Sequence, residues 1–348
     1  MTRREIIAKT IAHEPTEYVP YSFDMTSKIA AAVHEWLADS GKLADDGFIG
    51  DYFQFVGPGA PAGFKAENVG GALYKDEFGC IWDYSAERRE VGDHGCLYKP
   101  ALAAPSLKGY VFPNGAAPGR FDHVDADGLT KSGKYIVLGI TGLFDTCWHL
   151  RGFENFLGDL ADSESSFAKE ALDLGTEFIC GIVNATPPCV NGVRFTEDWG
   201  LQKGLMMSPV LWRKLLKPCL KKMYDAARSR GFNVIIHSCG DITDILPDLI
   251  EIGAEVVNPI QPEAMDVHKV KREYGRDLTF YGGIGSQSTL VYGTVQDVID
   301  EVEDRVRTVG KDGGYIIGPA GAAPCDAKLE NIFKLVELCM NGLKIKIN

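Results

Sequence analysis

The stretch "NVIIHSCGDITDILPDLIEIGAEVVNPIQ", residues 233–261, contains the pattern on which the fold prediction rests. It begins with the apolar run 233–240, which has the length and β-branched content of a strand and stops at a glycine. A helical pattern follows, and a second apolar run, 255–261, completes the unit. Two apolar strands separated by a helix predict parallel strands with the helix covering one face.

The same alternation extends along the chain from about residue 128. The predicted strands are 134–140, 192–198, 233–240, 255–261, 278–285 and 313–320, with helices between them, among them 208–230 and a last one from Ala327 to about Leu343. With "VPYSFDM" (19–25) as a first strand, the count reaches seven or eight. A (β/α)8 barrel fits this count best. A doubly wound sheet is the alternative, but no glycine-rich phosphate-binding turn follows any strand.

Residues 57–125 interrupt the alternation. They are rich in glycine, and "ALYKDEFGCIWDYS" (72–85) predicts a β-hairpin with "DEFG" at its turn. We expect one domain, 1–348, that begins with a short helix and carries this segment as an insertion capping one barrel mouth. An arm that contacts a second copy of the chain is the alternative.

The overall composition argues against several classes of protein. A net charge of −12 argues against nucleic-acid binding, which depends on basic contacts to phosphate. The longest apolar runs are shorter than the roughly 20 residues of a membrane span. Nine scattered cysteines do not resemble a disulfide framework, and the N-terminus lacks the features of a secretion signal. These features predict a cytoplasmic protein whose cysteines are mostly small core residues.

Polar and thiol side chains crowd the C-terminal ends of the predicted strands, where barrel enzymes assemble their active sites. These positions include Asp24, Thr141, Asp145, Glu197, Asp198, His237, Cys239, Asn258, Gln261, Tyr281, Gln287, Cys325 and Asp326. The strand bodies are apolar by contrast. This asymmetry favours an enzyme over a barrel that only binds a small molecule or a partner.

His237 and Cys239 are two residues apart, so on a strand their side chains point to the same side. Imidazole and thiolate are both good zinc ligands, but a zinc site needs a third protein ligand. Cys325, in the loop after the last strand, could supply it, and so could Glu197 or Asp198. Packing alone is the alternative for the pair.

Other candidates have plainer explanations. The acidic pair Glu197–Asp198 could simply cap the start of a helix instead of binding a metal or acting as a general acid. His149 and His268 fit structural roles better than catalytic ones.

Several motifs together resemble a known superfamily. They are "FTED…HSCG" (195–240), "HSCGDITDILPDLIEIGAEVVNPIQPEA" (237–264), "LTFYGGIGSQSTL" (278–290) and "GGYIIGPAGAAPCDAKLENI" (313–332). In this order they resemble the uroporphyrinogen-decarboxylase-like superfamily, and within it the corrinoid-dependent methyltransferases. The resemblance is dense over about 128–343, implies a distorted TIM barrel and suits a homodimer.

The N-terminal region departs from the true decarboxylases of that superfamily, which bind porphyrinogen carboxylates with an arginine-rich motif. The matching stretch, "EYVPYSFDMTSKIAAAV" (17–33), contains no arginine. Several carboxylates would lack guanidinium partners there, so porphyrinogen decarboxylation is disfavoured.

Two methyltransferase types remain. The methylcobamide:thiol methyltransferases bind zinc through an H-x-C pair, matched by His237 and Cys239, and a later cysteine, whose position here is Gly321, four residues before Cys325. That departure favours the O-demethylase type, which moves a methyl group from a methoxylated compound, often a phenyl methyl ether, to Co(I) of a separate corrinoid protein. This chain has no "DxHxxG"-like cobalamin-binding signature, so a partner protein is expected to carry the corrinoid.

The resemblance implies a role for each candidate. His237 and Cys239, with Cys325 as a candidate third ligand, are expected to bind zinc, which would stabilise the leaving oxygen. Glu197 or Asp198 would be a further ligand or a general acid. Substrate-binding positions are expected at Asp24, Asn258, Gln261 and Tyr281. A metal-free lyase of the superfamily is the alternative of another class.

Overall fold

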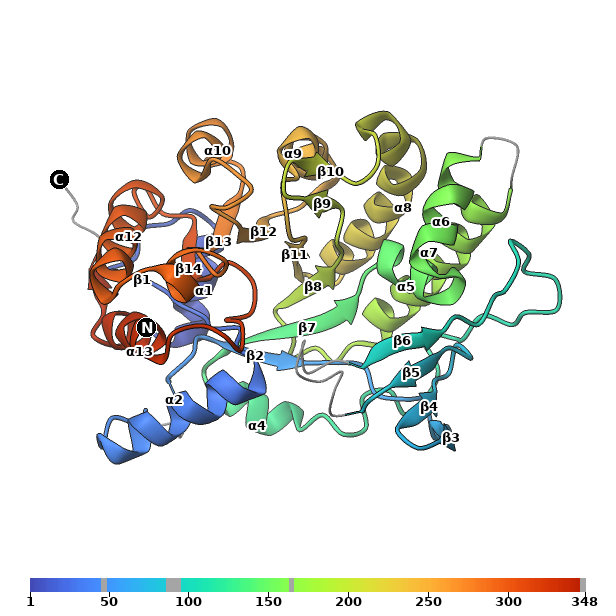
Figure 1. Cartoon of the computed structure of the whole chain (residues 1–348), viewed down its shortest axis with the longest axis horizontal. Helices are drawn as coiled ribbons and strands as arrows, with labels where there is room; N and C mark the ends of the chain where they lie inside the picture. Colours follow the sequence, from blue (N-terminus) through green and yellow to red (C-terminus); the bar gives the residue numbers. More distant parts are fainter. Residues whose placement is uncertain (45–48, 86–94, 163–165, 345–348) are drawn as a thin grey trace.

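The computed structural model describes residues 1–44, 49–85, 95–162 and 166–344. Seven parallel strands form one curled sheet in the order β14-β13-β12-β11-β8-β7-β2 (Figure 1). Their bounds are β2 Phe53–Val56, β7 Tyr135–Thr141, β8 Gly192–Thr196, β11 Asn233–His237, β12 Val256–Ile260, β13 Thr279–Ile284 and β14 Tyr315–Pro319. The fold is a distorted TIM barrel, as predicted, and each of the six strands predicted between 134 and 320 is present.

The predicted first strand, 19–25, is where the barrel is distorted. The regular strand there, β1 (Tyr18–Val19), pairs antiparallel with β15 (Leu343–Lys344) instead of joining the barrel sheet. Residues 20–25 follow β14 only through isolated bridges such as Tyr21 with Ile317. On the side of β2 a carboxylate replaces the backbone ladder, because the Phe23 N–H and the Ser22 hydroxyl donate to Asp51 at 3.0 and 3.1 Å. The prediction of a regular strand over 19–25 was therefore wrong.

The predicted N-terminal helix closes the N-terminal end of the barrel. Helix α1 (Arg3–Ile11) begins with a capping box between Thr2 and Glu5. Its Ile7 and Ile11 pack inside the barrel in one apolar cluster with Phe53 and Tyr135, the first residues of β2 and β7. The other end of the barrel is left for polar side chains.

Helices surround the sheet on its outer face (Figure 1). They are α2 Ser27–Asp39, α5 Leu143–Arg151, α6 Phe153–Ala161, α7 Phe167–Ala185, α8 Pro209–Ser229, α9 Leu246–Ile252, α10 Val267–Tyr274, α11 Thr289–Tyr292, α12 Val295–Thr308 and α13 Leu329–Met340. Helix α8 illustrates why they form: Ser208 caps it, and Trp212, Leu216, Leu220 and Met223 are buried at intervals of three or four residues.

The insertion, 57–125, contains a four-stranded antiparallel sheet of β3 (Glu67–Gly70), β4 (Leu73–Lys75), β5 (Ile81–Asp83) and β6 (Cys96–Lys99), and α4 (Ala126–Lys131) follows it. The predicted hairpin is confirmed, since β4 and β5 pair around the Asp76–Gly79 turn.

The insertion starts directly after β2 and packs on α5. Its contacts include a hydrogen bond from the Leu102 N–H to the Leu150 carbonyl at 2.8 Å, and one from the Cys80 thiol to the His149 carbonyl at 3.3 Å. It thus lies beside the C-terminal ends of β2 and β7 (Figure 1). That it caps the barrel mouth stays a prediction.

Two further features bear on the predictions from composition. All nine cysteines lie in the described ranges, and none of them forms a disulfide bond. Within the described ranges, no helix combines the length and the apolar character needed to cross a bilayer.

Candidate metal centre

The ends of β8 and β11 bring the two predicted motifs side by side. The strands are parallel, with Thr196 opposite His237, and the Glu197 N–H donates to the His237 carbonyl at 2.8 Å. The Ser238 hydroxyl accepts a hydrogen bond from the Trp199 N–H at 3.0 Å. The two segments therefore run together past the end of the sheet.

Three side chains meet there with ligand atoms within 4.8 Å of one another: Asp198, His237 and Cys239. His237 Nε2 lies 3.8 Å from Cys239 Sγ, and the Cys239 N–H donates to Asp198 Oδ1 at 2.9 Å. Imidazole nitrogen, thiolate sulfur and carboxylate oxygen are the three ligand types that zinc takes in proteins. The donor set fits zinc and leaves the fourth coordination position to a substrate or a water molecule.

The imidazole of His237 is held in the form that a metal requires. Asn258 Oδ1 lies 2.6 Å from His237 Nδ1, so Nδ1 carries the proton and donates, and the Nε2 lone pair faces Cys239. Burial is the main cause that lowers the pKa of His237, and the nearby Arg194 guanidinium lowers it further. His237 is therefore neutral at pH 7. Asn258 was predicted to contact substrate, and in the structure it contacts the His237 imidazole.

We expect the Asn258→Ala variant to bind zinc about 10–100-fold more weakly than the unaltered protein, because the imidazole loses the acceptor that fixes its orientation. Asn258→Asp keeps an acceptor oxygen beside Nδ1 and should retain most of the affinity. Competition with a chromophoric chelator measures both. Equal affinities for Asn258→Ala and the unaltered protein would contradict this role.

Cys239 is a protonated thiol when no metal is bound. Burial, followed by the negative charge of Asp198, raises its pKa to about 12. A thiolate at this position needs a compensating positive charge, which a divalent metal ion supplies.

Glu197 lies outside the cluster, although sequence alone left it equal to Asp198. Its carboxylate accepts hydrogen bonds from the N–H groups of Leu143 and Phe144, at 2.5 and 2.9 Å, and so caps the first turn of α5. Gly142 makes room for it, since a Cβ there would lie 2.3 Å from the Glu197 carboxyl carbon. The side chain is fully buried, and this burial raises its pKa. The structure thus gives Glu197 the capping role considered from sequence.

Cys325 is also outside the cluster. It lies in the loop after β14, near the bridge between Met25 and Ala323, and its carbonyl accepts a hydrogen bond from Lys28 at 3.4 Å. The loop therefore follows the N-terminal segment, and the cluster contains a carboxylate, Asp198, as its third group.

The remaining predicted substrate positions have protein partners or are buried. Gln261 Oε1 accepts from the Gly240 N–H at 3.0 Å and so fixes the turn after Cys239. Tyr281 is 2% exposed in the barrel interior, and its hydroxyl has no hydrogen-bond partner among the described residues. Asp24 forms an ion pair of 2.9 Å with Arg194.

Two groups near the site were missed from sequence or given no role. Arg194 stands in the middle of the predicted strand 192–198, and its guanidinium lies 4.5 Å from the centre of the Phe55 ring. A charged residue within an apolar strand was the signal that could have revealed it. Asp145, noted only as a strand-end residue, accepts a hydrogen bond from Trp148 Nε1 at 2.8 Å.

Burial and the charge of Asp198 raise the pKa of Asp145 to about 7, whereas an unfolded aspartate titrates near pH 4. The folded protein therefore holds a proton that the unfolded chain releases, so stability falls as pH rises from about 4 to 7. The Asp145→Asn variant keeps the Trp148 hydrogen bond but cannot titrate. Over this pH range, and without metal, we expect its free energy of unfolding to fall by roughly 2–4 kcal/mol less than that of the unaltered protein.

Urea unfolding at pH 5 and pH 8 measures this difference. Asp173→Asn, which alters a surface pair with Lys169, is the control. Parallel pH dependences for Asp145→Asn and the unaltered protein would show that Asp145 does not carry the effect.

The comparisons with known proteins agree with this architecture. The family model for uroporphyrinogen decarboxylase (URO-D) matches residues 135–341. The chain is similar in structure to a methyltransferase from Methanosarcina mazei, with a TM-score of 0.70 and 18% identity over 98% of both chains, which shows the shared fold. A D-psicose 3-epimerase is far less similar, with a TM-score of 0.33 and 11% identity over 63% of this chain and 82% of that one. No curated protein sequence matches the chain. Because the family match spans more than half of the chain, this protein belongs to the uroporphyrinogen decarboxylase (URO-D) family.

Proposed function

We propose that this protein is a methyltransferase that moves a methyl group from a methoxylated small molecule, such as a phenyl methyl ether, to the cobalt of a corrinoid carried by a separate protein. The observation that carries the proposal is the cluster of Asp198, His237 and Cys239 at the C-terminal end of the barrel. The similarity to a protein named as a methyltransferase supports it.

In this reaction the ether C–O bond breaks, the methyl carbon bonds to cobalt, and the oxygen leaves with the bonding electrons. Zinc held by Asp198, His237 and Cys239 would act as a Lewis acid toward that oxygen. The protein's own contribution is to keep the donor groups in place before substrate arrives. Asn258 fixes the imidazole tautomer, and Gln261 fixes the turn after Cys239.

Two observations disfavour the alternatives. The thiol methyltransferases have a second cysteine ligand, whereas the third donor here is a carboxylate. A porphyrinogen decarboxylase needs several guanidinium groups for its substrate, and Arg194 is already paired with Asp24.

A screen of methyl donors with a reduced corrinoid protein tests the proposal. We expect a methoxylated aromatic compound to produce the absorbance of methylated cobalt only when the zinc-loaded protein is present. Methylation of a thiol by a methylated corrinoid, with no reaction of any ether, would favour the thiol methyltransferase instead. Decarboxylation without metal or corrinoid would favour the lyase.

A further inference from the structure

A cavity of about 570 Å³ lies between the insertion and the helices α5 and α7. Its walls include Thr141 at the end of β7 and Thr146 of α5. Thr141 pairs in the sheet with Thr196, and Thr196 lies two residues before Asp198 in the sequence. Thr146 follows Asp145, which lies close enough to Asp198 for the charge of Asp198 to raise its pKa. The cavity and the metal cluster therefore lie at the ends of the neighbouring strands β7 and β8.

The cavity has aromatic walls. Phe64, Phe78, Trp82, Tyr84 and Phe178 line it. The rings of Phe78 and Phe178 pack edge to face at 4.9 Å, and Trp82 packs in the same way against His149 at 4.8 Å. Aromatic and apolar walls of this kind suit a flat ring.

Among the described residues of the lining, Arg120 is the one cation, and the protein occupies all of its donors. Arg120 is 2% exposed and binds Glu77 with both terminal nitrogens, at 2.8 and 2.6 Å. Its other N–H groups donate to the carbonyls of Asn114 and Gly59, which uses all five donors. Asp76 accepts from Trp82 Nε1 and from two backbone N–H groups. A ligand carboxylate would find no free cation among the described lining residues and would lie near the acidic groups of Asp76 and Glu77.

His149 is one of the polar groups in the lining that are available to a ligand. Burial lowers the pKa of His149 to about 4, so its imidazole is neutral at pH 7. Within the described part of the chain, its ring nitrogens have no hydrogen-bond partner. A neutral imidazole can donate to or accept from a phenolic hydroxyl.

We propose that this cavity binds the ring of an uncharged methoxylated aromatic compound, with His149 as its hydrogen-bond partner, and that it selects methoxyphenols over methoxybenzoates. This inference rests on the proposed function and names the substrate class for it.

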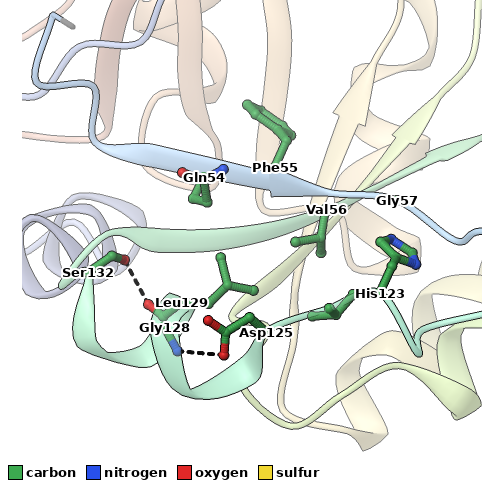
Figure 2. Close-up of a pocket in the computed structure, with 10 residues that line it drawn as sticks. Gln54, Phe55, Val56, Gly57, His123, Asp125, Gly128, Leu129 and Ser132 are labelled. Atoms are coloured by element: carbon green, nitrogen blue, oxygen red, sulfur yellow. Dashed lines mark hydrogen bonds between the residues drawn. The ribbon is translucent and has the colours of Figure 1, made fainter. Parts of the chain in front are cut away.

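A second cavity, of about 490 Å³ between β2 and α4, lacks this chemistry (Figure 2). The polar groups of Asp125 and Ser132 are used within α4, since Asp125 accepts from the Gly128 N–H and Ser132 donates to the Leu129 carbonyl. Its His123 provides a matched control for His149.

Calorimetric titration of the full-length protein with 2-methoxyphenol and 2-methoxybenzoate, without corrinoid, tests the inference. We expect 2-methoxyphenol to bind at least about 10-fold more tightly, because the described lining residues offer no free cation to the carboxylate of 2-methoxybenzoate. His149→Ala should weaken its binding at least about 5-fold, and His123→Ala should leave it unchanged. Ala60→Trp should abolish binding, because Ala60 lines the cavity at an exposed position that tolerates a larger side chain without unfolding.

Preference for 2-methoxybenzoate, or unaltered binding of 2-methoxyphenol by Ala60→Trp, would overturn the inference. Binding that depends on His149 and Ala60, with no methyl transfer to any corrinoid protein, would support the cavity and refute the proposed function. Methyl transfer from 2-methoxyphenol that neither variant affects would support the proposed function and refute the cavity as the place where the ring binds.

Discussion

The His237→Ala variant is expected to lose its zinc and at least about 10³-fold of its methyl-transfer rate. His237 Nε2 lies 3.8 Å from Cys239 Sγ, and its lone pair points there because Asn258 binds the opposite ring nitrogen. Without it, two protein donors remain, fewer than a stable zinc site has. Elemental analysis and the absorbance of methylated cobalt measure the two losses.

His268→Ala is the matched control. His268 is half-exposed on α10, which carries no residue of the cluster, and its Nε2 lies 3.2 Å from Oδ2 of Asp304. Circular dichroism verifies that both variants fold. A folded His237→Ala protein that transfers methyl groups at the unaltered rate would place the active site elsewhere.

The two cysteines considered as ligands provide an internal comparison. Cys239→Ser should lose zinc together with activity, since Cys239 belongs to the cluster. Cys325→Ser should keep both, because the donor set is complete without it. Zinc loss in Cys325→Ser alone would mean that the loop after β14 folds over the site when metal binds.

Sequence could predict those parts of the site that depend on local geometry. The alternation of side chains along a strand places His237 and Cys239 on one side, whatever surrounds them. Sequence could not choose between Glu197 and Asp198, because consecutive residues of an extended chain point to opposite sides. The choice is made by α5, whose free N–H groups take Glu197.

In the fold, too, sequence could predict the parts that depend on a local pattern but not those that depend on distant residues. Strands such as β11 and β12 were predictable because both of their faces are covered, which makes them mostly apolar. The irregular structure of residues 20–25 could not be predicted, because Asp51 takes the place of a backbone partner on one side. Asp51 lies about 28 residues away, so no local sequence pattern indicates this contact.

The second large effect is expected on stability. Glu197→Ala should lower the free energy of unfolding by about 3–5 kcal/mol, because it leaves the N–H groups of Leu143 and Phe144 buried without acceptors and opens a cavity. Urea unfolding measures the loss. Glu170→Ala, which removes an exposed carboxylate from the first turn of α7, should change stability by less than about 0.5 kcal/mol.

The zinc content of the same variant distinguishes a capping residue from a ligand. If Glu197 only caps α5, folded Glu197→Ala protein retains its zinc, since Asp198, His237 and Cys239 are intact. The stability of Glu197→Gln should lie between those of the unaltered protein and Glu197→Ala. The amide oxygen can accept one of the two hydrogen bonds, while the NH₂ group opposes the other N–H. A protein that keeps its stability but loses zinc would reverse the assignment, making Glu197 the metal ligand and leaving Asp198 to hold the Cys239 backbone.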